Sequence, residues 1–304
     1  MENIPIELVN NIKDFVIFKP KTKKELKEAV DLWCKNKDEA LIRYNHISNW
    51  NTSLIEHMSG LFRWKSKFND DISNWDVSNV IDMSYMFVEC NDFNQNLNKW
   101  DVSSVTNMRA MFCLAYSFNQ PLDLWNVSSV TKMKDIFQKA YAFNQPLDSW
   151  DVSSVTDMSF MFEEALDFNQ PLNSWDVSSV TNMEGMFFQA ESFNQPLDSW
   201  VVSSVTNMGS MFVEAIKFNQ PLDSWDVSSV TNMSFMFGDC YKFNQPLNSW
   251  DTSSVTIMCC MFQEALSFNQ PLNSWNVSLV TNMDNMFKEA SSFDERNALW
   301  YYFN

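Results

Sequence analysis

Two histidines, His46 and His57, are the side chains of this sequence best suited to proton transfer. A serine–histidine–aspartate arrangement of the GxSxG type needs its nucleophile on a glycine-flanked turn, and the four glycines of this chain all stand alone. The motifs HExxH, GxGxxG and GxxxxGK[ST] are also missing. We therefore expect no enzyme activity and no cofactor, with both histidines serving as polar surface residues.

Aspartates recur at two fixed places of a repeating pattern, and stacked carboxylates are ligands that Ca²⁺ prefers. One set is Asp76, Asp101, Asp151, Asp176, Asp226 and Asp251, and the other is Asp123, Asp148, Asp198 and Asp223. Asn126, Val201 and Asn276 interrupt the first set, and the Gly-rich turn of Ca²⁺-binding β-rolls is absent. A solvated acidic face is the favoured interpretation, with a Ca²⁺-binding solenoid as an alternative.

The charge of the chain argues against polyanionic partners. Its net charge is −17, with +1 over residues 1–75 and −18 over residues 76–304. Such a chain is repelled by phosphate backbones, so we expect no nucleic acid partner. No apolar run is long enough to span a membrane, and the first residues lack the pattern of a secretory signal. The sequence therefore predicts a soluble protein without membrane insertion, either intracellular or particle-associated.

Tryptophan reveals the organisation of the chain, because eleven of its thirteen tryptophans are spaced by 25 residues. They are Trp50, Trp75, Trp100, Trp125, Trp150, Trp175, Trp200, Trp225, Trp250, Trp275 and Trp300. The surrounding text, close to FNQPLNSWDVSSVTNMSFMFEEA, returns with each of the later ones. Most of the chain is thus one structural unit copied end to end, with the indoles predicted to stack inside.

One copy, residues 168–192, shows the expected fold of the unit. Alternation over residues 174–178 predicts a short strand, with Trp175 and Val177 on its inner side. Apolar residues at steps of three and four over residues 180–190 predict a helical turn. We expect a right-handed α/β solenoid of about ten coils, each with a short parallel strand and a helical turn. The repeats occupy residues 46–304, including a C-terminal cap.

A column of asparagines is predicted to tie successive coils together and to replace the missing glycines. Its members are Asn69, Asn94, Asn119, Asn144, Asn169, Asn194, Asn219, Asn244 and Asn269.

Residues 1–45 lack the repeat and are predicted to form an N-terminal helical cap. Residues 22–43 have the pattern of an amphipathic helix, and Thr22 with Glu25 fits a capping box. The segment Ile4–Ile12 resembles the opening of an F-box helix but is too short for that module, so a simple capping helix is favoured.

Positions on the outer side of the predicted helical turn differ from copy to copy and include aromatic residues. These candidate partner-binding residues are Phe160, Phe235, Tyr116, Tyr141 and Tyr241. Exposed aromatics on a rigid column are good binding anchors. Drift at unconstrained positions, with some rings packing between coils, is the competing interpretation.

The repeat FNQPLxxWDVSSVTNMxxMFxxA resembles that of the mycoplasma-type lipoprotein family, also called BspA-like leucine-rich-repeat surface proteins. The resemblance covers residues 46–300 and also includes the preceding segment, residues 18–30. It implies a leucine-rich-repeat-like stack, with Leu172, Trp175, Val177 and Val180 in place of the LxxLxLxxN signature. Bacterial relatives are often surface proteins tied to adhesion, and similar repeats occur in algae and in large DNA viruses of amoebae.

The favoured function is a non-enzymatic scaffold that binds a protein partner along an elongated acidic surface. The alternatives are a surface or particle-associated structural or adhesion protein that recognises host molecules, and the Ca²⁺-binding solenoid described above. Neither the identity of the partner nor the oligomeric state follows from these residues.

Overall fold

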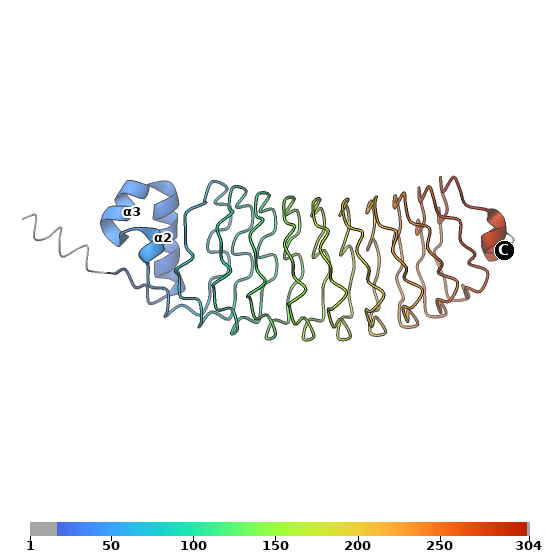
Figure 1. Ribbon diagram of the computed structural model, residues 1–304, viewed down its shortest axis with the longest axis horizontal. Coiled ribbons are helices and arrows are strands. Elements are labelled where there is room, and N and C mark those ends of the chain that lie inside the picture. The colour runs from blue at the N-terminus through green and yellow to red at the C-terminus, as the bar shows by residue number, and fades with distance from the viewer. Residues whose placement is uncertain (1–16, 303–304) are drawn as a thin grey trace, which may run out of the picture.

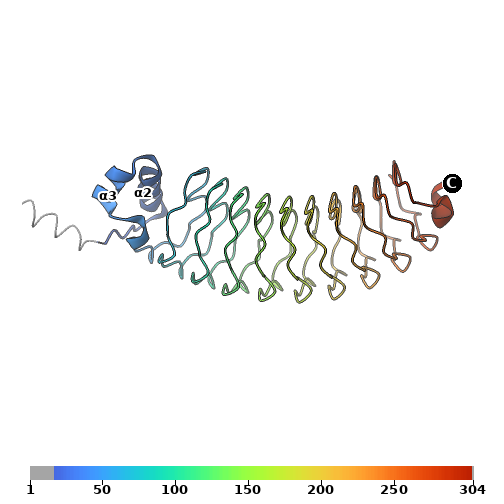
Figure 2. The ribbon, with the colours of Figure 1, turned by 45° about the horizontal axis from the view of Figure 1, so that its top comes forward.

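The computed structural model describes residues 17–302 and shows a row of stacked coils with short helices at both ends (Figure 1). Helices α2 (Lys23–Lys35) and α3 (Lys37–Tyr44) and the 3-10 turn η1 (Ile47–Asn49) precede the coils. The 3-10 turn η2 (Glu295–Ala298) and helix α4 (Leu299–Tyr302) follow them. The row bends gently along its length (Figure 2). The segment Ile4–Ile12 lies outside the described residues.

The predicted α/β class is wrong. Within residues 17–302 the structure has short helices at the two ends, and no β-strand and no sheet. Adjacent coils are joined instead by isolated parallel bridges between equivalent residues, the first being His57–Asp82 and the last Ile257–Asn282. The coils are therefore built of turns and irregular segments, not of the strand and helical turn of a leucine-rich-repeat-like unit.

The predicted strand over residues 174–178 fails because turns bracket it. The backbone N–H of Trp175 donates to the carbonyl of Leu172 at 3.1 Å, and that of Val180 donates to Val177 at 2.9 Å. Each bond closes a tight turn, so the chain is extended only between them. Trp175 and Val177 do point inward, as alternation requires, but two inward residues do not make a strand.

The predicted helical turn over residues 180–190 fails because alternate N–H groups from Met183 to Gln189 donate to the next coil. Met183, Gly185, Phe187 and Gln189 donate to backbone carbonyls of that coil, at 2.7–2.9 Å. The intervening N–H groups close turns within the coil, for example Ala190 onto Phe187 at 3.0 Å. An α-helix would instead direct every N–H to the residue four earlier.

Positive φ angles at two places of each coil complete this turn segment. Gly185 and Gln189 have φ of 57° and 54°, and equivalent residues of other coils, such as Phe160 and Glu164, do the same. The left-handed conformation is thus adopted mostly by residues other than glycine. The asparagine column does not supply it, so that part of the prediction is wrong.

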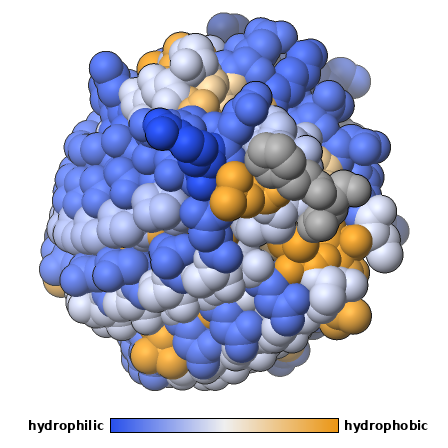
Figure 3. Space-filling model, turned by 90° about the vertical axis from the view of Figure 1, so that its right-hand side faces the viewer, coloured by the Kyte–Doolittle hydropathy of each residue, from blue (hydrophilic) through white to orange (hydrophobic). Residues whose placement is uncertain are grey.

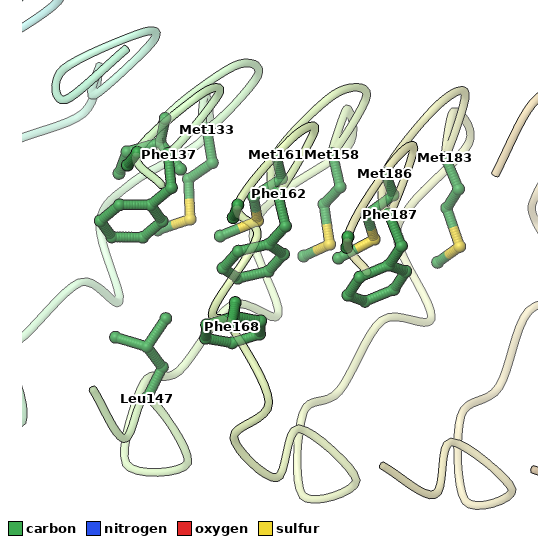
Figure 4. Close-up of a cluster of buried hydrophobic side chains, with 14 of the residues drawn as sticks. Met133, Phe137, Leu147, Met158, Met161, Phe162, Phe168, Met183, Met186 and Phe187 are labelled. Carbon is green, nitrogen blue, oxygen red and sulfur yellow. The ribbon is translucent and has the colours of Figure 1, made fainter. Parts of the chain in front are cut away.

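The core is a set of continuous side-chain columns running through the coils. Figure 4 shows Met133, Met158 and Met183 at equivalent places in successive coils, next to the column of Phe137, Phe162 and Phe187. All of these side chains are buried. Rings of one column lie nearly parallel, as in Trp125–Trp150, whose centroids are 6.4 Å apart with an interplanar angle of 1°. Each coil therefore buries its apolar side chains against its two neighbours.

Two polar ladders fix the register of the coils. Each repeat tryptophan from Trp75 to Trp300 donates its indole N–H to a carbonyl of the preceding coil, as Trp175 does to Leu147 at 2.9 Å. The side-chain oxygen of Asn169 accepts from the backbone N–H of Asn194 at 2.9 Å and from the amide of Gln195 at 3.1 Å. The same asparagine bond recurs from Asn69 to Asn269.

The N-terminal segment forms two helices where the sequence predicted one. Thr22 caps α2 by accepting from the N–H of Glu25 at 3.2 Å, but the chain turns at Asn36, whose φ is −149°. The Asn36 side chain then caps α3 by accepting from Glu39 at 3.2 Å. Leu26, Ala29, Val30 and Trp33 of α2 are buried and belong to the same core cluster as the coils.

The opposite end of the row is less covered. Val277, Val280 and Met283 of the last coil are partly exposed, although most of their equivalents in earlier coils are buried. Figure 3 looks onto this end and shows apolar areas among polar ones.

Candidate interaction surface

One outward side of the coils varies in sequence while the others repeat. We call it the variable face and define it by Ser234, Phe235, Gly238, Asp239 and Tyr241, together with the residues that occupy the same places in the other repeats. Other outward positions are nearly constant, with serine at the third position after each repeat tryptophan from Trp50 to Trp275 and threonine at the sixth position after most of them. The constant outward side chains bond within or between coils, as the Thr181 hydroxyl does to the carbonyl of Thr156 at 3.2 Å, so folding accounts for their constancy. The variable face carries exposed aromatic rings such as Trp64 as well as variation, and this makes it the candidate site.

The backbone of the turn segment holds the variable face in place. Phe235 and Asp239 occupy the two positive-φ positions of their coil, with φ of 55° and 56°. Their N–H groups donate to Cys259 and Gln263 of the next coil, at 2.9 and 2.7 Å. The ladder of backbone bonds therefore fixes both the direction and the spacing of the side chains that leave these positions.

The N-terminal part of the variable face is an alternation of guanidinium groups and aromatic rings. The Arg63 guanidinium lies 4.3 Å from the ring centroid of Trp64 and 5.5 Å from that of Tyr85. The guanidinium of Arg109, on the coil that follows that of Tyr85, lies 5.6 Å from the Tyr85 ring centroid. Trp64 is 63% exposed, so its ring is available for contact. Sequence reasoning missed Trp64 and Tyr85, although Trp64 was visible as one of two tryptophans outside the series.

A small apolar cluster forms within this part of the variable face. Val88, Ala110 and Cys113 are buried, with Tyr85 and Leu114 packed against them, and the cluster is separate from the main core. Burial raises the pKa of the Cys113 thiol to about 12. The thiol is therefore protonated at neutral pH, and it donates to the side-chain oxygen of Gln138 on the next coil, at 3.1 Å.

The three aromatic residues predicted from the middle coils are engaged with their neighbours. The rings of Tyr116 and Tyr141 stack at 4.7 Å with an interplanar angle of 4°. The Phe160 ring lies over Gly185, where an added Cβ would come within 2.4 Å of it, and the Lys134 ammonium lies 5.2 Å from the Phe160 centroid. All three residues are half-buried, which matches packing between coils as well as exposure of one ring edge.

Phe235 and Tyr241, the two predicted residues of the C-terminal half, are more exposed. Phe235 is 38% and Tyr241 is 37% exposed, and Leu266 of the next coil is 40% exposed. Ile216 occupies the position of Tyr241 in the preceding coil and is half-buried. Successive coils in this half thus present neighbouring apolar side chains on one side.

A row of carboxylates runs beside these apolar residues, and sequence reasoning missed it. Glu214, Asp239 and Glu264 follow one another at the same place in three coils. Partial burial raises the pKa of Asp239 to about 6, and the charge of Glu264 and Glu214 adds to the shift. The signal was available in the sequence, because the three acids occupy one repeat position without interruption.

The corresponding carboxylate of the middle coils is neutralised. Lys139 places its Nζ 2.9 Å from a carboxylate oxygen of Glu164, and Arg109 lies 3.5 Å from Asp135 on the same face. Among the ion pairs of residues 17–302, none involves Glu214, Asp239 or Glu264. The variable face therefore changes along its length from paired charges to unpaired negative charge.

A cavity of about 560 Å³ lies where the helical segment meets the first coil. Trp33, Trp64, Lys35, Lys37 and Lys67 are among its lining residues. Asp70, which also lines it, accepts from the Trp33 indole at 2.8 Å and pairs with Lys37 at 2.5 Å. Burial is the largest single effect and raises the pKa of Asp70. The bonds from Lys37 and Trp33 together outweigh it, so the pKa is lowered overall. The acidic group is already satisfied and mainly ties the helices to the coil.

The two sets of aspartates considered as Ca²⁺ ligands are bonded differently. Asp123 and Asp198 of the second set accept from Asn98 and Asn173 of the preceding coil, at 2.8 and 3.0 Å, whereas the first set accepts from serines of its own coil. Asp151 accepts from the N–H and hydroxyl of Ser153 at 3.1 and 2.6 Å, which lowers the pKa of its carboxyl. Asn126 accepts the equivalent bonds from Ser128, so an uncharged acceptor fills the same role at this position. In the part of the chain that the structure describes, no three His, Cys, Asp or Glu side chains converge as metal ligands.

The two histidines occupy different structural positions. The His46 ring is 2.8 Å from the Ser48 hydroxyl and accepts from the Ser48 N–H at 3.3 Å, which caps η1. His57 begins the column of bridges between coils. Each position is explained by local structure.

One known protein family matches the row of coils. The model of the family described as "Mycoplasma protein of unknown function, DUF285" matches residues 34–149, 117–225 and 193–300, three overlapping stretches that cover the whole row of coils. The chain belongs to this family. No curated protein and no solved structure gave a match.

The family matches begin at Cys34, near the end of α2, and reach Trp300 in α4. The chain is thus a repeat protein of the DUF285 family, and the family description assigns no function. Among the described residues, none of the helices has the length and apolar character required to cross a bilayer.

Proposed function

We propose that the protein is a non-enzymatic scaffold that binds a protein partner along its variable face. The observation that carries the proposal is the contrast among outward positions. Residues of the variable face differ from coil to coil and include the aromatic residues Trp64, Phe235 and Tyr241, whereas the other sides mostly repeat small polar residues, with single exposed aliphatic residues among them. Exposed aromatic side chains on a rigid support contribute much of the binding energy of protein interfaces.

The architecture also supports binding over an extended surface. Each coil contacts only its neighbours, so the surface lengthens with each repeat while its local geometry stays constant. The resemblance to BspA-like surface proteins favours a narrower form of the same proposal, in which the partner is a host surface molecule. The Ca²⁺-binding alternative is less well supported, because aspartates of the first set accept from serines of their own coil.

The test compares two sets of exposed apolar residues on different sides. The first variant carries Trp64→Ala, Phe235→Ala and Tyr241→Ala on the variable face. The matched control carries Leu124→Ala, Val201→Ala and Leu279→Ala, which are 68%, 56% and 56% exposed elsewhere. Substitution of the more exposed residues should change the free energy of unfolding by about 0.5 kcal/mol or less, and substitution of Phe235 or Tyr241, which are 38% and 37% exposed, by about 1–2 kcal/mol. Thermal unfolding of each variant shows that it is folded before capture is compared.

Tagged proteins are incubated with lysate and with surface extract of the source cells, and captured partners are quantified by mass spectrometry. We expect a partner that binds the wild type and the control equally and is lost from the variable-face variant. Equal capture by all three proteins would contradict the proposal, and so would loss from the control alone.

A further inference from the structure

We propose that the apolar row Ile216, Tyr241 and Leu266, with the carboxylates of Glu214, Asp239 and Glu264 beside it, binds a basic amphipathic helix of a partner protein. This inference rests on the proposed function and names the chemistry of the partner for one part of the variable face.

The apolar row is a continuous strip across three coils. Tyr241 and Leu266 are 37% and 40% exposed, which leaves each side chain with surface for contact. Each apolar residue lies two positions after an acid and is tied to it through the backbone: the N–H of Ile216 donates to the backbone carbonyl of Glu214 at 2.8 Å, and that of Tyr241 to the backbone carbonyl of Asp239 at 3.0 Å. A binding segment must therefore present apolar and charged residues in two parallel stripes.

The unpaired carboxylates determine which charge the partner must carry. Glu214, Asp239 and Glu264 form no ion pair among the described residues, although Lys217 and Lys242 lie nearby in sequence. The next acid of the row, Glu289, has Lys288 at 3.7 Å. Three adjacent carboxylates repel one another, and lysine or arginine side chains of a partner would replace repulsion by attraction.

The spacing of the coils favours a helix over an extended strand as the segment that binds. Backbone hydrogen bonds join adjacent coils at the variable face, as from the N–H of Asp239 to the carbonyl of Gln263 at 2.7 Å, and chains joined in this way lie about 4.7 Å apart. A helix presents residues of one stripe about every 5.4 Å, the helical pitch. An extended strand presents residues of one face about every 6.6 Å. Over two coil steps the helix accumulates a mismatch of about 1.4 Å, which a long basic side chain absorbs, and the strand accumulates about 4 Å.

The first experiment uses defined peptides and the full chain. The probe is an alanine-based helix with lysines at i, i+4 and i+7 and a neighbouring stripe of leucines. The control peptide has the same composition with its lysines distributed around the helix. Binding is measured by calorimetry and repeated at higher salt. We expect the striped peptide to bind at least about tenfold more tightly than the control peptide. Equal affinities would show attraction by net charge alone and would overturn the proposal.

The second experiment locates the site with charge-matched variants. One carries Glu214→Gln, Asp239→Asn and Glu264→Gln, and the other carries Asp151→Asn, Asp176→Asn and Asp226→Asn on a polar side. Both lose three charges, and Asn126 shows that asparagine keeps the local bonds of the residues changed in the second variant. We expect the first variant to bind the striped peptide about tenfold more weakly and the second to bind it as the wild type does.

A third variant, Tyr241→Ser with Leu266→Ser, tests the apolar row at constant charge and should also weaken binding about tenfold. Unchanged binding by this variant or by the variable-face charge variant would overturn the proposal. So would self-association that the charge variant abolishes, since a second copy would then occupy the row. Partner capture that depends on the variable face but not on these five residues would overturn this inference alone and leave the proposed function standing.

Discussion

At the scale of single residues, Asp239 and Asp226 show that the pKa of an aspartate depends on its place in the coil. Its carboxyl is partly buried and shares a hydrogen bond with Glu264, so its pKa rises from 3.8 to about 6. Asp226, on a polar side of the same coil, accepts from Ser228 at 3.1 and 2.7 Å, and its pKa is lowered. The same residue type is thus disfavoured as an anion at one position and favoured at the other.

Asp239→Asn is therefore predicted to stabilise the protein at neutral pH. The native state binds the Asp239 proton more tightly than the unfolded state does, so wild-type stability falls as pH rises from about 4 to about 6. We expect the variant to gain about 1 kcal/mol at pH 7.5, because solvent screens much of the repulsion at this only partly buried position, and to gain little at pH 4. Urea unfolding at both pH values measures this.

Asp226→Asn is the control, and it should bring no gain at pH 7.5. A stability difference for Asp239→Asn that is the same at pH 4 and pH 7.5 would contradict the titration of this carboxyl in the native state.

At the scale of the element, the coil is held by bonds to its neighbours more than by its own regular structure. Asn169 receives two hydrogen bonds from the next coil and donates its backbone N–H to Asn144 at 3.0 Å. The turn segment sends alternate N–H groups to the next coil. Removing an acceptor from such a ladder leaves a half-buried donor unpaired.

Asn169→Leu should accordingly lower the free energy of unfolding by about 1–3 kcal/mol, the cost of an unsatisfied polar group. Asn169→Asp keeps the acceptor oxygen and should cost less. Chemical denaturation followed by tryptophan fluorescence gives both values. If the leucine and aspartate variants were equally destabilised, the ladder bond would not be the cause.

At the scale of the whole molecule, the coils form a one-dimensional stack between the helices of the two ends (Figures 1 and 2). Every core column repeats with the period of the tryptophan series, so any coil sees nearly the same neighbours as the next. Stability in such a stack is approximately a sum of coil and interface contributions.

Deletion of one full coil, residues 176–200, should therefore preserve the fold. The junction joins Trp175 to Val201 in phase, and the denaturant dependence of unfolding should fall by roughly a tenth, in proportion to the surface lost. Deletion of residues 176–188 alone puts the tryptophan column out of phase and should give an unfolded or aggregated chain. Circular dichroism and tryptophan emission distinguish the two, and equal tolerance of both deletions would contradict a phase-locked stack.

The sequence by itself determined the period, the inward residues and the polar ladder. Trp175, Met183 and Phe187 are buried as their spacing predicts, because apolar area must leave water whatever the local backbone does. The acidic row of Glu214, Asp239 and Glu264 was equally readable, since equivalent repeat positions must stack.

Only the tertiary structure decided the conformation of each coil. Val180–Ala190 has the spacing of a helix, but its alternate N–H groups find carbonyls in the next coil, and residues such as Gly185 and Gln189 turn to positive φ. Those partners lie almost a full repeat away along the chain, beyond the reach of any local pattern. The same bonds decide that Phe160 lies over Gly185 and that Phe235 and Tyr241 remain more exposed.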